Sequence, residues 1–544
     1  MTANHKWLLL TLVLGTVLML SAPLGALAQG AGEGCCWWND RVFYEIFVRS
    51  FKDSDGDGIG DLQGLIQQLD YLNDDDDRTK PDLAITGLWL MPVTEAASYH
   101  GYDTLDYRQI EQDYGSLDDF RQLIDAAHQR GIAVLIDLVI NHSSDQHPWF
   151  VASAQGNPEY DDWYVWADQD PGYRGPDGQV VWHERGGRYY YGVFWGGMPD
   201  LNYANPAVSE EMIDVARFWL DEVGADGFRI DAVKHLIEDG REQENTPATL
   251  DWIETYQDAL HEFAPDSLLV GEVWSTSYAS ADYVGNGIDL VFEFDLATGM
   301  LHAARQRNAD GVRSLQNRAL DLYPPGQYAT FLTNHDQTRV MTELRENVDA
   351  ARVAASALLT GPGVPFIYYG EEIGMTGTKR PGDYLIRTPM QWDATPATAG
   401  FTTGEPWHLV NVDLAEVNVA LQQDDPDSLL SHYRTLIQLR NEHAALQRGA
   451  YIPIDTGSRR VYAFLRQNAD ETLLVLINFD DDPVVDYGLT LEAGSVSADT
   501  AITTLFGTDS PLAAPAIDAN GQFSAYQPLP ELAPYSTLIL QVGS

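Results

Sequence analysis

Three carboxylate residues, Asp231, Glu272 and Asp336, stand at or shortly after the ends of short apolar runs. An ionised carboxylate can act as a nucleophile, and a carboxyl group that keeps its proton can act as a general acid. These residues belong to a set of four polar blocks, at 137–142, 227–231, 271–274 and 334–336. A lone aspartate after a strand is usually a helix cap or loop residue. Four polar blocks that each follow a strand are much harder to explain in this way, so together they indicate a catalytic site.

In this order, the four blocks closely resemble the conserved regions of the α-amylase family of glycoside hydrolases. The resemblance extends from about Trp38 to the C-terminus. The segment Met198-Pro199-Asp200-Leu201-Asn202 resembles that of α-amylases intermediate between oligo-1,6-glucosidases and neopullulanases. The resemblance implies a retaining hydrolase, in which two carboxyl groups ~5 to 5.5 Å apart act as nucleophile and acid/base.

By this resemblance Asp231 is the nucleophile, Glu272 is the acid/base, and Asp336 binds sugar hydroxyls and distorts the ring. Arg229 precedes Asp231 by two residues, so on a strand both side chains point to the same side, where the cation keeps Asp231 ionised at low pH. Glu272 needs a raised pKa, which a dry setting lined by tryptophan would give. His142 and His335 match family residues that bind hydroxyls of the sugar at the cleavage point.

Two further segments favour different substrates. The family segment that resembles 99–103 has a tyrosine, here Tyr102, that stacks on the sugar and an aspartate, here Asp103, that contacts it. Arg387 resembles an arginine that pairs with that aspartate in oligosaccharide-cleaving members. This pair would close the non-reducing end of the cleft and favour exo action or short substrates, although a structural ion pair at the barrel rim is the alternative.

The residues that follow the nucleophile favour long chains instead. Lys234 and His235 resemble α-amylase residues that contact sugars beyond the scissile bond, and Ala232 is smaller than its usual counterpart in α-1,6-cleaving members. We therefore expect hydrolysis of α-1,4 bonds in starch and malto-oligosaccharides. The alternatives are an α-glucosidase or transglycosylase on short oligosaccharides and a non-catalytic glucan-binding relative. The last lacks one or more of the carboxylates, whereas this chain has all three.

Calcium is the expected cofactor, at two sites. Oxygen ligands at alternate positions, interrupted by glycines, are typical of calcium loops, and they occur here at Asp53, Asp55, Asp57 and Asp61. The segment also resembles the calcium loop after the first strand in oligo-1,6-glucosidase-like members, which implies that Ile59 contributes its carbonyl. The alternative for this segment is an acidic solvated turn. The family resemblance implies a second site from Asn141, Asp200 and the His235 carbonyl, tying an inserted subdomain to the barrel.

The elements that must position these residues alternate between apolar runs and amphipathic stretches, which predicts a parallel sheet wrapped by helices. The predicted strands are 42–47, 85–90, 133–138, 227–230, 268–270, 290–294, 328–332 and 364–368. Eight strands suggest a (β/α)8 TIM barrel, which places catalytic groups at the carboxyl ends of its strands. The clearest helix begins with the cap Ser116-x-x-Asp119 and stops at Gly131.

The barrel is expected to span 37–140 and 204–448. Between them, 141–203 is rich in Gly, Pro, Asp and aromatic residues, and we interpret it as a subdomain inserted after the third strand. Short alternating runs from 449 to 544 predict a C-terminal antiparallel β-sandwich. Residues 1–28 have the charged start, apolar stretch and Ala26-Leu27-Ala28 site of a secretory signal peptide.

The amino-acid composition limits the classes of molecule that this protein can bind. The 544 residues include 32 Lys and Arg against 81 Asp and Glu, a net charge of −49 that repels nucleic acid and anionic lipid. A neutral α-glucan fits this surface, which also suits a salt-rich habitat. We expect a secreted, extracellular monomer with no integral membrane segment after signal removal. A lipid anchor at Cys35 is an alternative, although Gly32-Glu33-Gly34 before it is a poor lipidation signal.

Overall fold

The computed structural model describes residues 36–75, 82–492, 496 and 501–542. The predicted signal peptide and Cys35 therefore lie outside the described residues. Within the described ranges, no helix has both the length and the apolar character needed to cross a membrane.

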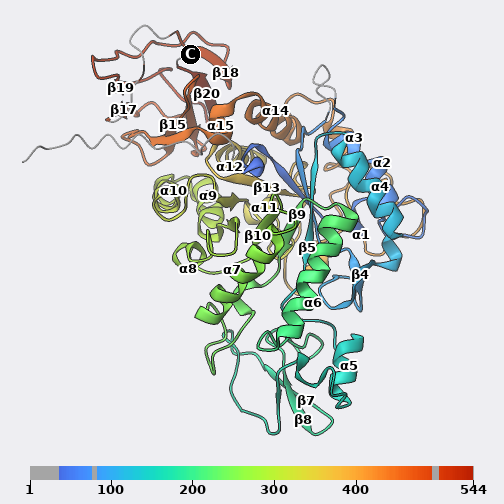
Figure 1. The fold of residues 1–544 in the computed structure, drawn as a ribbon. Coiled ribbons are helices and arrows are strands. Elements are labelled where there is room, and N and C mark those ends of the chain that lie inside the picture. Colours follow the sequence, from blue (N-terminus) through green and yellow to red (C-terminus); the bar gives the residue numbers. More distant parts are fainter. Residues whose placement is uncertain (1–35, 76–81, 493–495, 497–500, 543–544) are drawn as a thin grey trace, which may run out of the picture.

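Eight parallel strands close into a barrel at the centre of the molecule (Figure 1). They are β1 (Phe43–Ile46), β2 (Gly87–Leu90), β5 (Ala133–Leu138), β9 (Gly227–Ile230), β10 (Leu268–Gly271), β11 (Leu290–Phe292), β12 (Tyr328–Thr330) and β13 (Val364–Tyr368). The strands follow one another around the ring in chain order, and β1 closes it by pairing in parallel with β13, Phe43 opposite Phe366. The predicted TIM barrel is confirmed.

Helices surround the barrel (Figure 1). The longer ones are α4 (Leu117–His128), α6 (Pro206–Arg217), α7 (Pro247–His261), α9 (Phe294–Gln306), α10 (Asp310–Leu322), α12 (Val348–Thr360) and α14 (Leu429–Glu442). The shorter ones are α1 (Val48–Phe51), α2 (Leu62–Gln67), α3 (Leu69–Leu72), α5 (Pro148–Ala154), α8 (Ser277–Ala281), α11 (Val340–Glu343), α13 (Val419–Gln422) and α15 (Ala444–Arg448). The predicted cap is confirmed, because Ser116 and Asp119 bond reciprocally at the start of α4.

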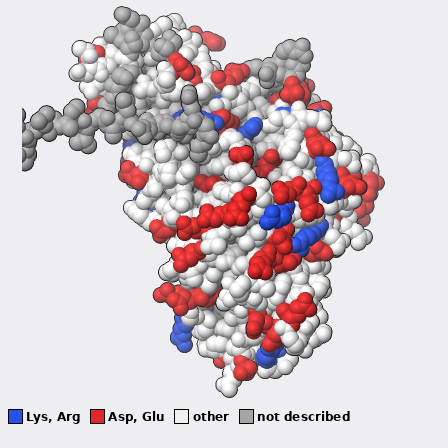
Figure 2. Space-filling view, in the orientation of Figure 1, with Lys and Arg blue, Asp and Glu red and all other residues white. Residues whose placement is uncertain are grey.

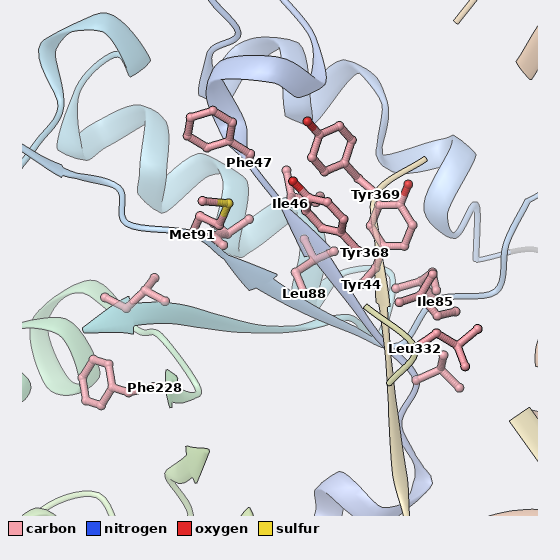
Figure 3. Packing of buried hydrophobic residues seen from close by; sticks show 14 of the residues in the cluster. Tyr44, Ile46, Phe47, Ile85, Leu88, Met91, Phe228, Leu332, Tyr368 and Tyr369 are labelled. Carbon is pink, nitrogen blue, oxygen red and sulfur yellow. The ribbon is translucent and has the colours of Figure 1, made fainter. Parts of the chain in front are cut away.

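The alternation of side chains along each strand gives the barrel two apolar layers. Phe43 of β1 points inward, where its ring stacks on Phe366 at 4.6 Å and lies so close to Gly87 that a Cβ there would come within 2.4 Å of it. Tyr44 and Ile46 point outward into the layer between strands and helices. Figure 3 shows part of that layer, with Tyr44 and Ile46 beside Tyr368. The inward-pointing side chains, such as Phe43 and Phe366, therefore fill the barrel interior beneath its mouth.

Two smaller parts lie at opposite ends of the barrel (Figure 1). Between β5 and α6 stand α5 and a three-stranded sheet of β6 (Trp166–Ala167), β8 (Arg188–Tyr191) and β7 (Trp182–Arg185). After α15 come a five-stranded sheet of β14 (Ala450–Pro453), β15 (Val461–Gln467), β16 (Thr472–Asn478), β20 (Thr537–Gln541) and β18 (Thr503–Phe506), and a pair, β17 (Leu489–Leu491) and β19 (Phe523–Tyr526). A hairpin of β3 (Thr94–Ala96) and β4 (Thr104–Ile110) follows β2.

The surface is strongly acidic. Figure 2 shows acidic side chains spread over one face of the molecule, with few basic ones between them. A neutral ligand meets no long-range electrostatic barrier at such a surface, whereas a polyanion is repelled.

Candidate active site

A pocket of about 770 Å³ opens at the carboxyl ends of the barrel strands. Its lining includes eight of the residues that the sequence predicted, namely Tyr102, His142, Asp231, Lys234, His235, Glu272, Asp336 and Arg387. Asp103, Arg229 and His335 do not line it. Another groove, of about 680 Å³, lies near the amino ends of the strands and contains none of the predicted catalytic or sugar-binding residues.

Arg229 lies fully buried beneath the pocket and contacts three carboxylates. Its Nη1 donates to Asp231 Oδ1 at 2.5 Å and to Asp137 Oδ1 at 2.8 Å. Its Nη2 lies 3.1 Å from Glu272 Oε2 without hydrogen-bond geometry. The predicted placement of Arg229 and Asp231 on one side of the strand is confirmed, and the stronger contact goes to Asp231.

Burial and charge set the protonation of these carboxyl groups. Burial raises the pKa of Glu272 to about 7, which the charge of Arg229 opposes. Burial also raises the pKa of Asp231, against the combined charge and hydrogen bond of Arg229. The sequence predicted the raised pKa of Glu272 but only the lowering effect of Arg229 on Asp231, because it could not show that Asp231 is itself buried.

A chain of hydrogen bonds supports the pocket from below. His335 is fully buried, with Nδ1 2.5 Å from Glu45 Oε1 and Nε2 2.7 Å from Tyr102 Oη. Tyr102 Oη in turn donates to Asp137 Oδ2 at 2.9 Å. Burial raises the pKa of Glu45 well above its ordinary value and lowers that of His335. Both shifts favour the neutral forms of these groups, and His335 contacts Glu45 and Tyr102 from behind the pocket wall.

Asp336 is held by two cations. Lys379 Nζ donates to its Oδ1 at 2.9 Å and Arg387 Nη2 at 3.0 Å. Burial opposes ionisation, but the electrostatic effects of His335, Arg387 and Lys379 outweigh it, and the pKa of Asp336 falls below its ordinary value. Asp336 therefore offers an ionised carboxylate to the pocket.

The predicted Asp103–Arg387 pair is not formed. Among the described residues, the carboxylates within ion-pair distance of Arg387 are those of Asp336 and Asp383, the latter at 3.1 Å. Asp103 is buried and accepts instead from the amide and hydroxyl of Ser98. Asp383, four residues before Arg387, forms the ion pair that was expected of Asp103. Nothing in the sequence pattern indicated this pairing.

His142 lines the other side of the pocket. Its Nε2 lies 3.0 Å from the Tyr102 carbonyl, so Nε2 carries a proton and donates it. Burial lowers the pKa of His142 to about 4, which keeps the ring neutral.

Aromatic side chains line the pocket where it meets solvent. Phe194 and Trp195 of the inserted segment and Trp274 after β10 all line it, and Trp195 is 55% exposed. Other aromatic residues of the insertion, such as Trp163 and Tyr190, pack in the core instead. A free ring face together with convergent polar groups suits a flat polyhydroxyl ligand.

Comparison with known proteins identifies the family. Residues 45–449 match the family model described as "Alpha amylase, catalytic domain". The chain is 39% identical to Alpha-amylase 3 of Dictyoglomus thermophilum over 82% of this chain and 85% of that protein. The chain belongs to the α-amylase family. It is an α-amylase family glycoside hydrolase of the retaining type, acting on glucan substrates.

Two other relatives indicate the subgroup of the family to which the chain is similar. It is 32% identical to an oligo-1,6-glucosidase of Parageobacillus thermoglucosidasius, over 82% of this chain and 91% of that one. The crystal structure of an alpha-amylase from H. orenii superposes with a TM-score of 0.79 at 41% identity, covering 92% of this chain and 99% of that chain. These relatives are consistent with a subgroup between the α-amylases and the oligo-1,6-glucosidases.

The loop after β1 brings several carboxylate oxygens close together, as a calcium site requires. Oxygens of Asp53, Asp55 and Asp61 lie within 4.8 Å of one another. Backbone amides of the loop bond to Asp53, and Gly58 has φ 97°, in a place where a Cβ would strike the Glu405 carbonyl. The Asp57 carboxylate accepts instead from the Ile59 amide. Three clustered carboxylates on a braced loop fit a hard cation such as Ca²⁺.

The second predicted calcium site also has suitable oxygens. Asn141 Oδ1 and Asp200 Oδ2 are buried and have no hydrogen-bond partner among the described residues, and the same is true of Oε1 of nearby Glu238. Burial and the charge of Glu238 raise the pKa of Asp200 well above its ordinary value. Unpaired buried oxygens are costly unless they are protonated or coordinate a cation, so this donor set fits Ca²⁺. The sequence missed Glu238.

Sequence reasoning also missed Glu45, Lys379 and Asp383. Glu45 could have been noticed as the one charged residue in the apolar run 42–47. Lys379 and Asp383 lie between β13 and α13, in a stretch whose one regular element is the short 3-10 helix η6 (Asp383–Leu385), so no periodicity indicates which side chains face the pocket.

Proposed function

We propose that the chain is a secreted α-amylase that hydrolyses α-1,4 bonds in starch and malto-oligosaccharides. The observation that carries this proposal is that Asp231, Glu272 and Asp336 line one pocket together with Lys234 and His235. The last two side chains follow β9 whereas Asp336 follows β12, so they come from different sectors of the barrel mouth, as contacts with sugars of a longer chain would require. Lys234 is held there by Glu244 at 2.7 Å.

In this mechanism Glu272 gives its proton to the glycosidic oxygen as the bond breaks. Its pKa of about 7 means that it is protonated at mildly acidic pH. Asp231, oriented by Arg229, attacks the anomeric carbon and forms a glycosyl–enzyme intermediate. Water activated by ionised Glu272 then releases the sugar. Ionised Asp336 stabilises positive charge that develops on the ring and binds its hydroxyls.

Calcium has a structural part in the proposal. Asp53, Asp55, Asp57, Asp61 and the Ile59 carbonyl would hold one ion, and Asn141, Asp200 and the His235 carbonyl a second, with Glu238 beside it. Bound Ca²⁺ supplies charge neutralisation to these carboxylates and cross-links the loops that bear them.

A second candidate is an α-glucosidase or transglycosylase on short oligosaccharides. The charged cluster at one end of the pocket favours it, because Arg387, Asp383 and Lys379 gather around Asp336 and Tyr99 bonds to Asp383 at 2.5 Å. Such a cluster could stop a chain from extending in that direction.

The time course of products from soluble starch distinguishes the two candidates. An α-amylase with access to internal bonds releases a range of malto-oligosaccharides and lowers the viscosity early. Release of glucose alone from chain ends, with no early fall in viscosity, would instead support the α-glucosidase.

A further inference from the structure

A second, smaller groove adjoins the catalytic pocket. Its volume is about 330 Å³, and it shares Trp274, Asp336 and Lys379 with the pocket. Its other lining residues include Thr298, His302, Arg305 and Glu343. The groove is therefore a side arm of the catalytic pocket. It has no role in the proposed hydrolysis of linear chains.

The order of the barrel strands fixes the direction of this side arm. Lys234 and His235 follow β9, and Asp383 and Arg387 follow β13, which stands opposite β9 in the ring of eight. The side arm lies along α9, which follows β11, midway between β9 and β13. A glucan that crosses the barrel mouth between those two ends thus passes the side arm near its middle, beside the catalytic carboxylates.

The lining of the side arm suits a neutral sugar. The Trp274 ring is 44% exposed and stacks on Phe294 with centroids 4.9 Å apart, so one face is supported and the other is free. The charges along the groove are already paired, Arg305 with Glu343 at 3.2 Å and Lys379 with Asp336 at 2.9 Å. Thr298 and His302 add exposed polar groups for hydroxyls.

We propose that the side arm binds the branch of an α-1,6-branched glucan whose main chain lies in the catalytic pocket. This inference rests on the proposed function. A linear chain has no substituent at that point and leaves the side arm empty, whereas a branch leaves the main chain there and enters it. Small-molecule sites begin at roughly 300 Å³, so the side arm holds a branch of about one or two glucosyl units.

Filling the side arm tests the proposal. Thr298 is exposed on α9, so Thr298→Trp should fold and occupy the groove. Thr255→Trp, at an exposed position of α7 outside both pocket and groove, is the matched control. We would measure kcat/KM of the full enzyme on a linear malto-oligosaccharide and on the same compound with one glucosyl α-1,6 branch. We expect Thr298→Trp to lose about tenfold on the branched compound, a loss equivalent to ~1.4 kcal/mol, and to stay within about twofold on the linear one.

A second variant opens the groove instead of filling it. His302→Ala removes a polar lining group and should lower only the activity on the branched compound. An equal effect of Thr298→Trp on both compounds, or no effect on either, would overturn the side-arm proposal while the linear activity still stood. Absence of wild-type activity on the linear compound would instead overturn the proposed function.

Discussion

Glu45 offers a sharp test of how the site is built. It is buried, it lies 2.5 Å from His335 Nδ1, and burial raises its pKa well above its ordinary value. In its neutral form, which burial favours, Glu45 can donate its proton to Nδ1, and the proton of His335 then stands on Nε2, which faces Tyr102 at 2.7 Å and Asp336 at 3.5 Å. Glu45→Gln keeps a donor at this place, whereas Glu45→Leu keeps the volume and removes it.

The two variants should differ strongly. In Glu45→Leu the buried Nδ1 has no partner, which costs about 1 to 3 kcal/mol and lets the ring change tautomer or turn. If that cost falls on the transition state, kcat/KM on soluble starch drops about 5- to 150-fold. Glu45→Gln should stay within about threefold of the wild type.

Thermal unfolding of both variants separates lost activity from lost fold. Equal losses in Glu45→Gln and Glu45→Leu would refute the reasoning, because a hydrogen-bonding group at position 45 would then make no difference to His335. Full activity in both variants would show that the chain of bonds has no part in catalysis.

Three further predictions concern acid catalysis, calcium and substrate binding. Because burial raises the pKa of Glu272 to about 7, kcat/KM should fall as pH rises through about 7 and the acid loses its proton; a rate that still rises above that pH would contradict this assignment. A chelator should lower the unfolding midpoint, since an ion bound only by the native state stabilises it, and Asp53→Ala should reduce the effect; a midpoint indifferent to the chelator excludes a structural calcium ion. Trp195→Ala, which removes a ring that is 55% exposed, should raise KM for starch about five- to tenfold with an unchanged unfolding midpoint; an unaltered KM would remove Trp195 from the binding surface.

The barrel was predictable because its strands are buried on both faces and so form short apolar runs with clear ends. The runs 133–138, 227–230 and 364–368 have the same bounds as β5, β9 and β13. Runs such as 290–294 continue past the end of the strand, since Phe294 is apolar but already begins α9. Apolar character predicts which residues are buried. It does not show where the backbone hydrogen bonds between neighbouring strands end, which is what sets the end of a strand.

The site was predictable where residues lie on or next to a strand and less so where a loop decides the contact. Arg229 and Asp231 meet because a strand places alternate side chains on one side. Arg387 forms ion pairs with Asp383 and Asp336 because of the path of the segment after β13, which no periodicity encodes. Burial was the other missing quantity, and it decides the pKa direction of Asp231.

Asp231→Asn tests the central claim most directly. The amide keeps the shape of the side chain and cannot attack the anomeric carbon, so initial rates on soluble starch should fall at least about 10³-fold while the unfolding midpoint stays within a few degrees. A folded Asp231→Asn enzyme that keeps an appreciable fraction of the wild-type rate would contradict the assignment of Asp231 as nucleophile.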